Sequence, residues 1–397
     1  MAPILSWGQN DVFHFLWAHN IPVVVENVNS KLKARWTPDA LIYSHGQDVV
    51  SMIRSSMAEA KIELVTVEQF FAEFKTQSRK DVVKIKESLD WPPSADLSTR
   101  FSDYFNDFMD VVPMPSYTRH NGFLNLTAHY PLPSNSGEHK SFKPDLGPKM
   151  YIATRDLYSR GSTALHLDAT SAVNILVHVE PDGSEEDGAL WHIFSTDDTP
   201  NLREYLRQTG NTSPDPIHAQ STYLTDPMLA NLWTQYRIKP YRIVQRYGDA
   251  VFIPAGCPHQ VSNRCGCIKI ACDFLCVEGV AATRTVSAEF QALRHEDILQ
   301  LDVMLWHCWS SLRRLSAVAD DEDEDEAPRP TRLQRKRMAG RATSNAKDDR
   351  IRKKRQRKSE SDRDLYDASV FRYSCPHAAC EGSKRLPFDL NGVLCHL

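Results

Sequence analysis

The chain has 397 residues, of which 41% are hydrophobic, and its formal net charge is −4. This length predicts two or three domains, or one large domain with tails. No apolar run approaches the ~18 residues of a membrane-spanning helix, and the N-terminus lacks a signal-peptide pattern. Nine cysteines without framework spacing favour a reducing compartment over secretion. We therefore expect a soluble intracellular protein with no membrane role.

Residues 1–130 are predicted to form a mixed, helix-rich lead-in. Apolar residues between Phe13 and Trp17 fall at helical spacing. Thr66 and Gln69 form a capping box, so a helix is expected to begin there. A further helix is expected to carry Phe101, Phe105, Phe108 and Met109.

The sequence pattern of residues 131–280 predicts mostly short strands. Pro200 and Pro227 mark the first turns of two helices that interrupt these strands. Many short strands without regularly alternating helices predict an antiparallel sandwich or barrel rather than a doubly wound sheet. The expected strands are Met150–Ala153, Ala164–Asp168, Ala172–Val179, Ala189–Phe194, Tyr241–Tyr247, Asp249–Ile253 and Ile268–Phe274.

The C-terminal part is predicted to lose its globular character. A closing helix over residues 281–317 carries an apolar face that includes Leu305 and Trp309. Residues 318–370, which open with the acidic run Asp320–Glu326 and continue with basic clusters, are expected to be disordered. Residues 371–397 regain cysteines and apolar residues and form a separate short segment.

One stretch of the chain carries a metal-ligand pattern. In Ala164–Asp168 the residues alternate, so a strand would place His166 and Asp168 on one face. A further imidazole is available at His259, where an apolar strand ends in a Gly/Pro turn. Two imidazoles and one carboxylate suit an open iron(II) site, with zinc as the alternative metal. A surface His and Asp that are close by accident are the bland alternative.

Several motifs in the same order give the chain a family resemblance. The upstream matches are Asp90-Trp91-Pro92-Pro93 and the stretch from Tyr117-Thr118 to Leu126. The main motifs are Gly147-Pro148-Lys149-Met150-Tyr151, Leu165-His166-Leu167-Asp168, Ala172-Val173-Asn174, Gly188-Ala189-Leu190-Trp191-His192-Ile193, Asp215-Pro216-Ile217-His218 and Gly248 to Val261. They resemble the Jumonji C (JmjC) oxygenases, and within them the branch that demethylates lysine-9 of histone H3. The resemblance covers roughly residues 10–280. It implies a mainly β, double-stranded β-helix (jelly roll, cupin-like) that holds iron(II) and 2-oxoglutarate, with His166, Asp168 and His259 as the iron ligands.

The co-substrate requires polar groups inside such a barrel. The distal carboxylate of 2-oxoglutarate needs a cation there, because an uncompensated buried charge is costly. Lys269, in the apolar strand Ile268–Phe274, is the candidate, and a lysine on the outer face of an edge strand is the alternative. Thr163 and Asn174 resemble the family's polar co-substrate contacts, although Thr and Asn are also ordinary residues of strand ends. Tyr151 is next in line if Lys269 does not bind the carboxylate.

The remaining cysteines suggest at most one further metal site. Cys257, Cys265, Cys267, Cys272 and Cys276 match no zinc spacing and are expected to be small buried hydrophobes. Near the C-terminus, Cys375 and Cys380 with His396 resemble a truncated C2H2 zinc finger, for which the alternative is a chance cysteine pair.

The resemblance implies a histone lysine demethylase of the nucleus, acting on mono- or dimethylated lysine-9 of histone H3. Basic clusters at Arg335–Arg337 and Arg352–Lys358 fit nuclear import and contact with DNA phosphates. A solvated linker is the alternative for this tail. Two other functions stay open: a JmjC protein hydroxylase, and a chromatin scaffold with a vestigial site.

Overall fold

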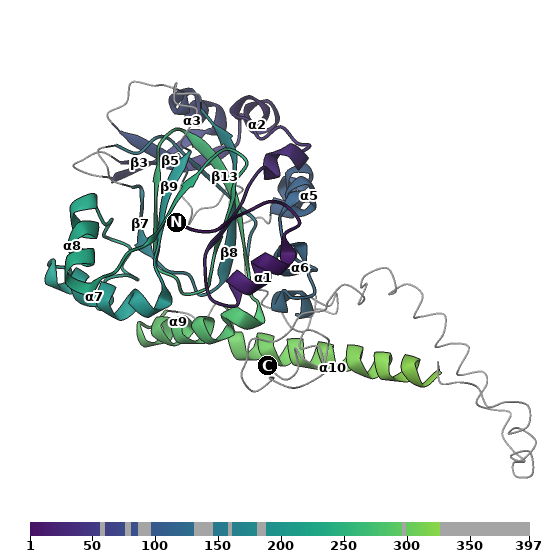
Figure 1. The fold of residues 1–397 in the computed structure, drawn as a ribbon. Coiled ribbons are helices and arrows are strands. Elements are labelled where there is room, and N and C mark those ends of the chain that lie inside the picture. Colours follow the sequence, from purple (N-terminus) through teal and green to yellow (C-terminus); the bar gives the residue numbers. More distant parts are fainter. Residues whose placement is uncertain are drawn as a thin grey trace, which may run out of the picture. The chain divides into compact units, whose positions relative to one another are not determined.

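The computed structural model describes residues 1–325 apart from 56–59, 76–80, 86–96, 131–145, 158–160, 181–187 and 296–298. The chain divides into two compact units, residues 1–304 and 305–397. The first unit holds two β-sheets with helices around them (Figure 1). None of the described helices is both long and apolar enough to cross a membrane.

The larger of the two sheets in the described residues has nine strands. Their order is β1 (Ile4–Leu5), β2 (Val23–Val25), β11 (Ala250–Ile253), β8 (Ser171–Val179), β13 (Cys267–Phe274), β6 (Lys149–Ala153), β5 (Val82–Ile85), β3 (Val49–Ser55) and β4 (Ala60–Thr66). The smaller sheet has the order β10 (Tyr241–Gln245), β9 (Ala189–Ile193), β12 (His259–Asn263) and β7 (Thr163–His166). Apart from the parallel pair β1–β2, the pairings between described strands are antiparallel.

Helices flank these sheets. They are α1 (Asn10–Trp17), α2 (Pro38–His45), α3 (Val67–Phe74), α4 (Leu97–Arg100), α5 (Ser102–Val111), α6 (Pro115–Thr118), α7 (Thr199–Gln208), α8 (Asp226–Tyr236) and α9 (Val280–Ala292). A further helix, α10 (Leu301–Asp325), begins at the end of the first unit and belongs mostly to the second. Short 3-10 turns are η1 (Val28–Lys31), η3 (Leu126–His129), η4 (Thr196–Asp198) and η5 (Val277–Gly279). The capping box of Thr66 and Gln69 is confirmed at the start of α3.

The hydrophobic core between the sheets follows from strand alternation. Val251 and Ile253 of β11 meet Trp191 and Ile193 of β9 in one buried cluster, so the two sheets face each other. Phe252, between Val251 and Ile253, points the other way and packs on Phe13 of α1, with ring centroids 4.9 Å apart. This sandwich of facing antiparallel sheets, with flanking helices, confirms the jelly-roll class.

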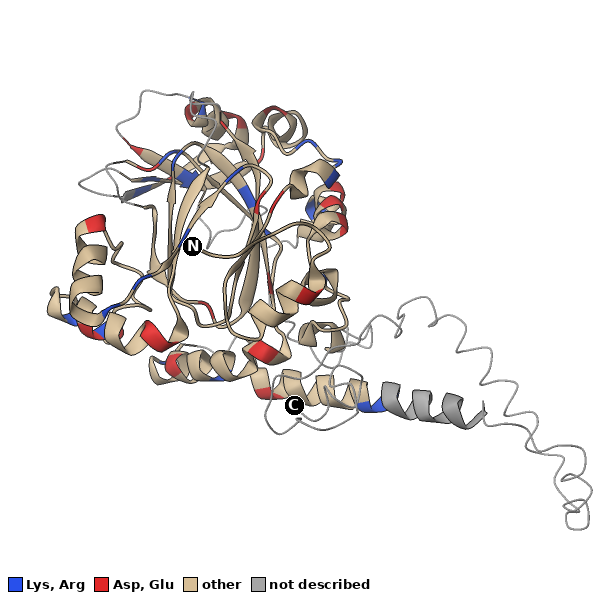
Figure 2. Ribbon diagram, in the orientation of Figure 1, with Lys and Arg blue, Asp and Glu red and all other residues tan. Residues whose placement is uncertain are grey.

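A second apolar cluster covers the outside of the small sheet. Leu165 of β7 and Leu167 pack with Leu202 of α7, Leu232 of α8 and Val286 of α9. Leu165 precedes His166, and Leu167 lies between His166 and Asp168. Both leucines are therefore buried on the outer face of the small sheet. Figure 2 shows that charged residues lie mainly on helices and connections, while the central strands of the sheets carry few. Charged residues that do occur on those strands therefore need an explanation.

The structure corrects several expected boundaries. β7 ends at His166, so Asp168 follows the strand instead of lying on it. His259 opens a strand, β12, that the sequence did not predict. The lead-in also contributes β3, β4 and β5 to the larger sheet, in addition to its helices.

The C-terminal expectation also needs two corrections. The single helix expected over 281–317 is two helices, α9 and α10. The backbone of α10 continues as a helix through most of the acidic run, to Asp325. Extending an existing helix costs far less than nucleating a new one, which explains why the charged run does not end it. The basic clusters and the Cys375–His396 segment lie outside the described residues.

Candidate metal centre and cavity

The two histidines of the predicted triad are oriented by their own backbone. His166 Nδ1 lies 2.8 Å from the carbonyl oxygen of Ala164, and His259 Nδ1 lies 3.0 Å from the carbonyl oxygen of Cys257. A carbonyl oxygen only accepts hydrogen bonds, so each Nδ1 carries the proton and each Nε2 keeps its lone pair. Both rings are therefore in the tautomer that binds a metal through Nε2.

These lone pairs converge with the carboxylate of Asp168. One ligand atom from each of the three residues lies within 4.8 Å of the others. The ring centroids of His166 and His259 are 4.2 Å apart, and His259 Nε2 is 3.7 Å from Asp168 Oδ2. Burial, together with the neighbouring His166 ring, lowers the pKa of His259 to about 4. A neutral, buried imidazole beside a more exposed carboxylate is a suitable donor set for a divalent cation.

The triad lies in a cavity of about 340 Å³ between the two sheets. Alternate residues of β13 line it, namely Cys267, Lys269, Ala271 and Asp273. The other strand lining comes from residues such as Tyr151, Thr163, Asn174, Trp191, Val261 and Asn263. The cavity thus brings together all six residues that the sequence analysis assigned to the metal and the co-substrate.

Lys269 occupies an unusual position for a lysine. β13 lies between β8 and β6 in the middle of the large sheet, and Lys269 is only 6% exposed. Its Nζ donates a hydrogen bond of 2.6 Å to Asn263 Oδ1 and lies 5.8 Å from the centre of the Trp191 ring. The buried carboxylate of Asp156 also interacts with it electrostatically. The alternative of an outer-face lysine on an edge strand does not describe this position, and the cavity offers a cation to an anionic ligand.

The other residues predicted to contact the co-substrate are Tyr151, Thr163 and Asn174, and each lies on a different strand. Tyr151 is the cross-strand neighbour of Lys269 on β6. Thr163 begins β7, three residues before His166. The Asn174 side chain is already engaged, because its Oδ1 accepts a hydrogen bond of 3.3 Å from Gln245 Nε2. Gln245 also accepts from the Trp191 indole at 2.8 Å, so the residue fixes two walls of the cavity.

Asn263 and Asp156 are functional candidates that no local sequence pattern indicates. Asp156 Oδ2 accepts a hydrogen bond of 2.7 Å from the Asn263 backbone amide, and burial raises the pKa of Asp156. Asn263 in turn accepts from Lys269. Counting every second residue from His259 along the strand leads to Val261 and Asn263, which both line the cavity. That period was a usable signal, but only after β12 had been recognised as a strand.

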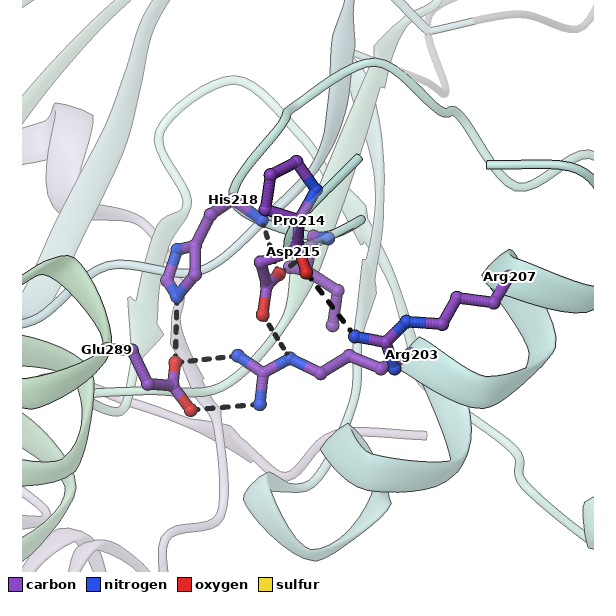
Figure 3. A network of polar contacts seen from close by, with 7 residues as sticks. Arg203, Arg207, Pro214, Asp215, His218 and Glu289 are labelled. Atoms are coloured by element: carbon purple, nitrogen blue, oxygen red, sulfur yellow. Dashed lines mark hydrogen bonds and ion pairs between the residues drawn. The ribbon is translucent and has the colours of Figure 1, made fainter. Parts of the chain in front are cut away.

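A second group of metal-type donors is formed by Asp215, His218 and Glu289 (Figure 3). Here the guanidinium of Arg203 lies between the carboxylates, 2.7 Å from Asp215 Oδ2 and 2.6 Å from Glu289 Oε2. His218 Nε2 is 2.7 Å from the same Glu289 oxygen. The positive charge that these carboxylates need is therefore already supplied, and the cluster joins α7, the 215–218 turn and α9. The motif Asp215-Pro216-Ile217-His218 has a structural role.

The five cysteines between Cys257 and Cys276 are buried and free. Burial raises the pKa of Cys257 to about 12. Within the part of the chain that the structure describes, no cysteine belongs to a metal-type cluster. They behave as small apolar residues, as expected from their spacing.

Comparison with known proteins finds a family model that covers the strands around this triad. The family model described as "JmjC domain, hydroxylase" matches residues 160–274, which run from just before β7 to the end of β13. Lysine-specific demethylase 3A of Rattus norvegicus is 34% identical over 352 residues, which cover 75% of this chain and 28% of that protein. Residues 160–274 of the chain are therefore a JmjC domain.

Two further relatives are similar over a comparable share of the chain. Lysine-specific demethylase 3 of Drosophila melanogaster is 31% identical over 369 residues, covering 78% of this chain and 42% of that protein. Lysine-specific demethylase JMJ26 of Arabidopsis thaliana is 30% identical over 377 residues, covering 75% and 42%. The chain thus spans less than half of the length of each of these relatives. His166, Asp168, His259 and Lys269 all lie within the JmjC domain.

Proposed function

We propose that this JmjC protein is an iron(II)- and 2-oxoglutarate-dependent lysine demethylase that acts on histones, with mono- and dimethylated lysine-9 of histone H3 as the preferred mark. One observation carries the proposal: two backbone-oriented imidazoles and a carboxylate share a cavity with a buried lysine. The relatives support the choice of reaction, because their names describe lysine-specific demethylases.

The donor set fits iron(II). His166, His259 and Asp168 would hold the metal, and this two-histidine, one-carboxylate set leaves other positions open. When bound, iron(II) and 2-oxoglutarate supply the activation of dioxygen that hydroxylation of a C–H bond requires. The tautomers of both histidines are fixed before any metal arrives, because the backbone carbonyls of Ala164 and Cys257 already hold Nδ1.

Lys269 fits the distal carboxylate of 2-oxoglutarate. It is a buried cation whose ammonium donates to the neutral Asn263 Oδ1, and it has further N–H groups to donate. Trp191 forms an apolar wall beside both the lysine and His259, since its ring is near each of them. This wall limits water in the reacting region and keeps the ionic contact strong.

The proposed reaction is tested with methylated histone peptides. The protein is incubated with iron(II), 2-oxoglutarate and ascorbate, and the peptides are weighed by mass spectrometry. Hydroxylation of an N-methyl carbon gives an unstable product that releases formaldehyde, so a demethylase removes methylene units. A gain of oxygen would instead identify a protein hydroxylase, and unchanged peptides would favour a chromatin scaffold. A panel of histone H3 peptides methylated at different lysines tests the preference for lysine-9.

A histone substrate requires a nuclear protein, and we place that function in the basic tail. Arg335–Arg337 and Arg352–Lys358 are the segments for import and for contact with DNA phosphates. Deleting residues 329–358 from a fluorescent fusion should leave the protein in the cytoplasm, while the purified deletion variant still acts on short peptides. A fusion that stays nuclear would contradict the import role. DNA binding that does not weaken as salt rises would contradict the phosphate contact.

A further inference from the structure

An apolar patch is exposed on the hairpin formed by β3 and β4. Val49 and Ile53 of β3 and Ile62 and Leu64 of β4 project from one face of this hairpin, as the strand register shows. We call these four residues the hairpin patch. Val49, Ile62 and Leu64 are 56%, 57% and 75% exposed. The opposite face is occupied: Arg54 pairs with Glu63 of β4 and, at 2.7 Å, with Glu73 of α3.

The hairpin patch lies on the same sheet face as the cavity. Ile62 is the cross-strand neighbour of Ile53, and Ile53 is the neighbour of Lys84 on β5. Lys84 is paired with Ala153 of β6, and Ala153 with Cys267 of β13. Paired residues project to one side of a sheet, so this row runs without interruption from β13 to the edge strand β4. Its inner members, Lys84, Ala153 and Cys267, all line the cavity.

Lys84 also connects the strands β5, β3 and β4 to the rim of the cavity. Its Nζ donates a hydrogen bond of 3.3 Å to the carbonyl oxygen of Ser162, directly before β7. The strands β5, β3 and β4 therefore form a platform that begins at the rim. The cavity itself, at about 340 Å³, is near the lower end of the range for small-ligand sites. It can accept a co-substrate and one side chain, so the main chain of a polypeptide substrate must lie outside it.

We propose that the hairpin patch is a docking surface for the polypeptide substrate, which contacts it through an apolar side chain close in sequence to the reacting lysine. This inference rests on the proposed function. An extended polypeptide is the occupant that the chemistry favours. A substrate side chain in the cavity leaves its main chain at the rim, and the row of paired residues leads from that rim to the exposed apolar side chains of the hairpin patch.

The platform also sets the spacing within the substrate. Neighbouring strands lie about 4.8 Å apart, so the three steps from β6 to β4 cover about 14 Å. An extended chain rises about 3.3 Å per residue and spans this distance in about four or five residues. The apolar side chain should therefore stand about four to six residues from the methylated lysine.

A peptide series tests the docking surface. Each peptide carries one dimethyl-lysine in a polar background, with a single leucine placed two to ten residues away on either side. For each peptide, KM is measured by formaldehyde release, and Kd by fluorescence anisotropy. The proteins are wild type, the double variant Ile62→Asp with Leu64→Asp, and Tyr43→Asp as the matched control. Tyr43 is 94% exposed on α2 and lies outside the hairpin patch.

For wild type and Tyr43→Asp, KM and Kd should both be lowest when the leucine stands four to six residues from the lysine. In the double variant this minimum should disappear, with a loss of about tenfold or more for the best peptide. The KM of a peptide without leucine and the kcat should stay unchanged, because the cavity is intact. Circular dichroism and melting of all three proteins check that they are folded.

Two results would overturn the docking surface. One is a KM and Kd that do not depend on leucine position in wild type, or that depend on it equally in the double variant. The other is a wild-type dimer that the double variant converts to a monomer without any change in peptide binding, since the patch would then join two copies of the chain. Anisotropy separates the two proposals: a position-dependent Kd without formaldehyde release would leave the docking surface standing and remove the demethylase reaction.

Discussion

Two clusters in this molecule present the same kinds of metal-binding side chains, but their surroundings differ. In the first, His166, Asp168 and His259 face a cavity, and backbone carbonyls orient both imidazoles. In the second, Arg203 lies between Asp215 and Glu289 and forms ion pairs with both (Figure 3). The first cluster has donors that need a cation, while the second already contains one. Proximity of donor atoms is therefore insufficient to identify a metal site.

The largest effect of a substitution is expected at the first cluster. Asp168→Ala should remove the carboxylate ligand and reduce succinate formation to background, a loss of at least ~1,000-fold, while the melting temperature changes little. Metal content, measured on the purified protein, should fall in parallel. Asp215→Ala is the matched control and should retain the metal, although it loses an ion pair with Arg203. If Asp168→Ala formed succinate at the wild-type rate, the triad would be assigned wrongly.

The next largest effect is expected at Lys269. Lys269→Met should remove the buried cation and weaken 2-oxoglutarate binding by about 3–5 kcal/mol, which is a factor of at least ~100 in the apparent affinity. Lys84→Met tests the other lysine that lines the cavity and should shift co-substrate dependence less, since Lys84 lies at the rim. A 2-oxoglutarate titration measures both. An unchanged titration for Lys269→Met would transfer the carboxylate contact to another residue, with Tyr151 next.

A smaller effect is expected at the second cluster, where replacing Arg203 should also turn the group of donors into a cation site. Arg203→Ala should destabilise the fold by about 2 kcal/mol, between the values typical of surface and fully buried ion pairs. It should also open a cation site formed by Asp215, His218 and Glu289. Zinc added to the metal-free variant should then raise its melting temperature. Arg207→Ala, on the same helix, should show neither effect. Equal responses to zinc in both variants would contradict the role given to Arg203.

The smallest expected effect concerns pH. Burial would raise the pKa of Glu289, but hydrogen bonds from His218 and Arg203 outweigh it and lower that pKa from 4.5 to about 2. The stability that ionised Glu289 contributes is therefore complete above pH 4.5 and is lost as the pH falls towards 2. Because burial raises the pKa of Asp249 to about 6, the total pH profile is mixed. The useful quantity is the difference in unfolding free energy between wild type and Glu289→Gln, which should shrink below pH 4.5.

The sequence was most informative where the pattern was local. The alternation around His166, the capping box at Thr66 and the proline-marked helices α7 and α8 all depend on residues within a few positions of each other. Lys269 stood out because a charge interrupts an apolar strand. These local signals were enough to predict the strands from β6 to β13 apart from β12. Together with the family resemblance, they pointed to six of the residues that line the cavity.

The features that the sequence did not predict depend on distant partners. β3 and β4 contain Arg54, Lys61 and Glu63, so their pattern does not identify a buried strand, and only pairing with β5 joins them to the main sheet. Arg203 and Glu289 are 86 residues apart, and no local pattern links them. Asn263 became recognisable as the partner of Lys269 only once the register of β12 was known.

The way in which the two histidines are held has a consequence for how such a site diversifies. Each ring is fixed by the carbonyl group two positions earlier in its own segment, Ala164 for His166 and Cys257 for His259. Because a backbone carbonyl is present whatever the side chain, this orientation does not depend on the identity of the neighbouring residues. The walls of the cavity can then mutate while the reactive centre persists. Substitutions in the walls can therefore change which ligand fits the cavity without changing the orientation of the two imidazoles.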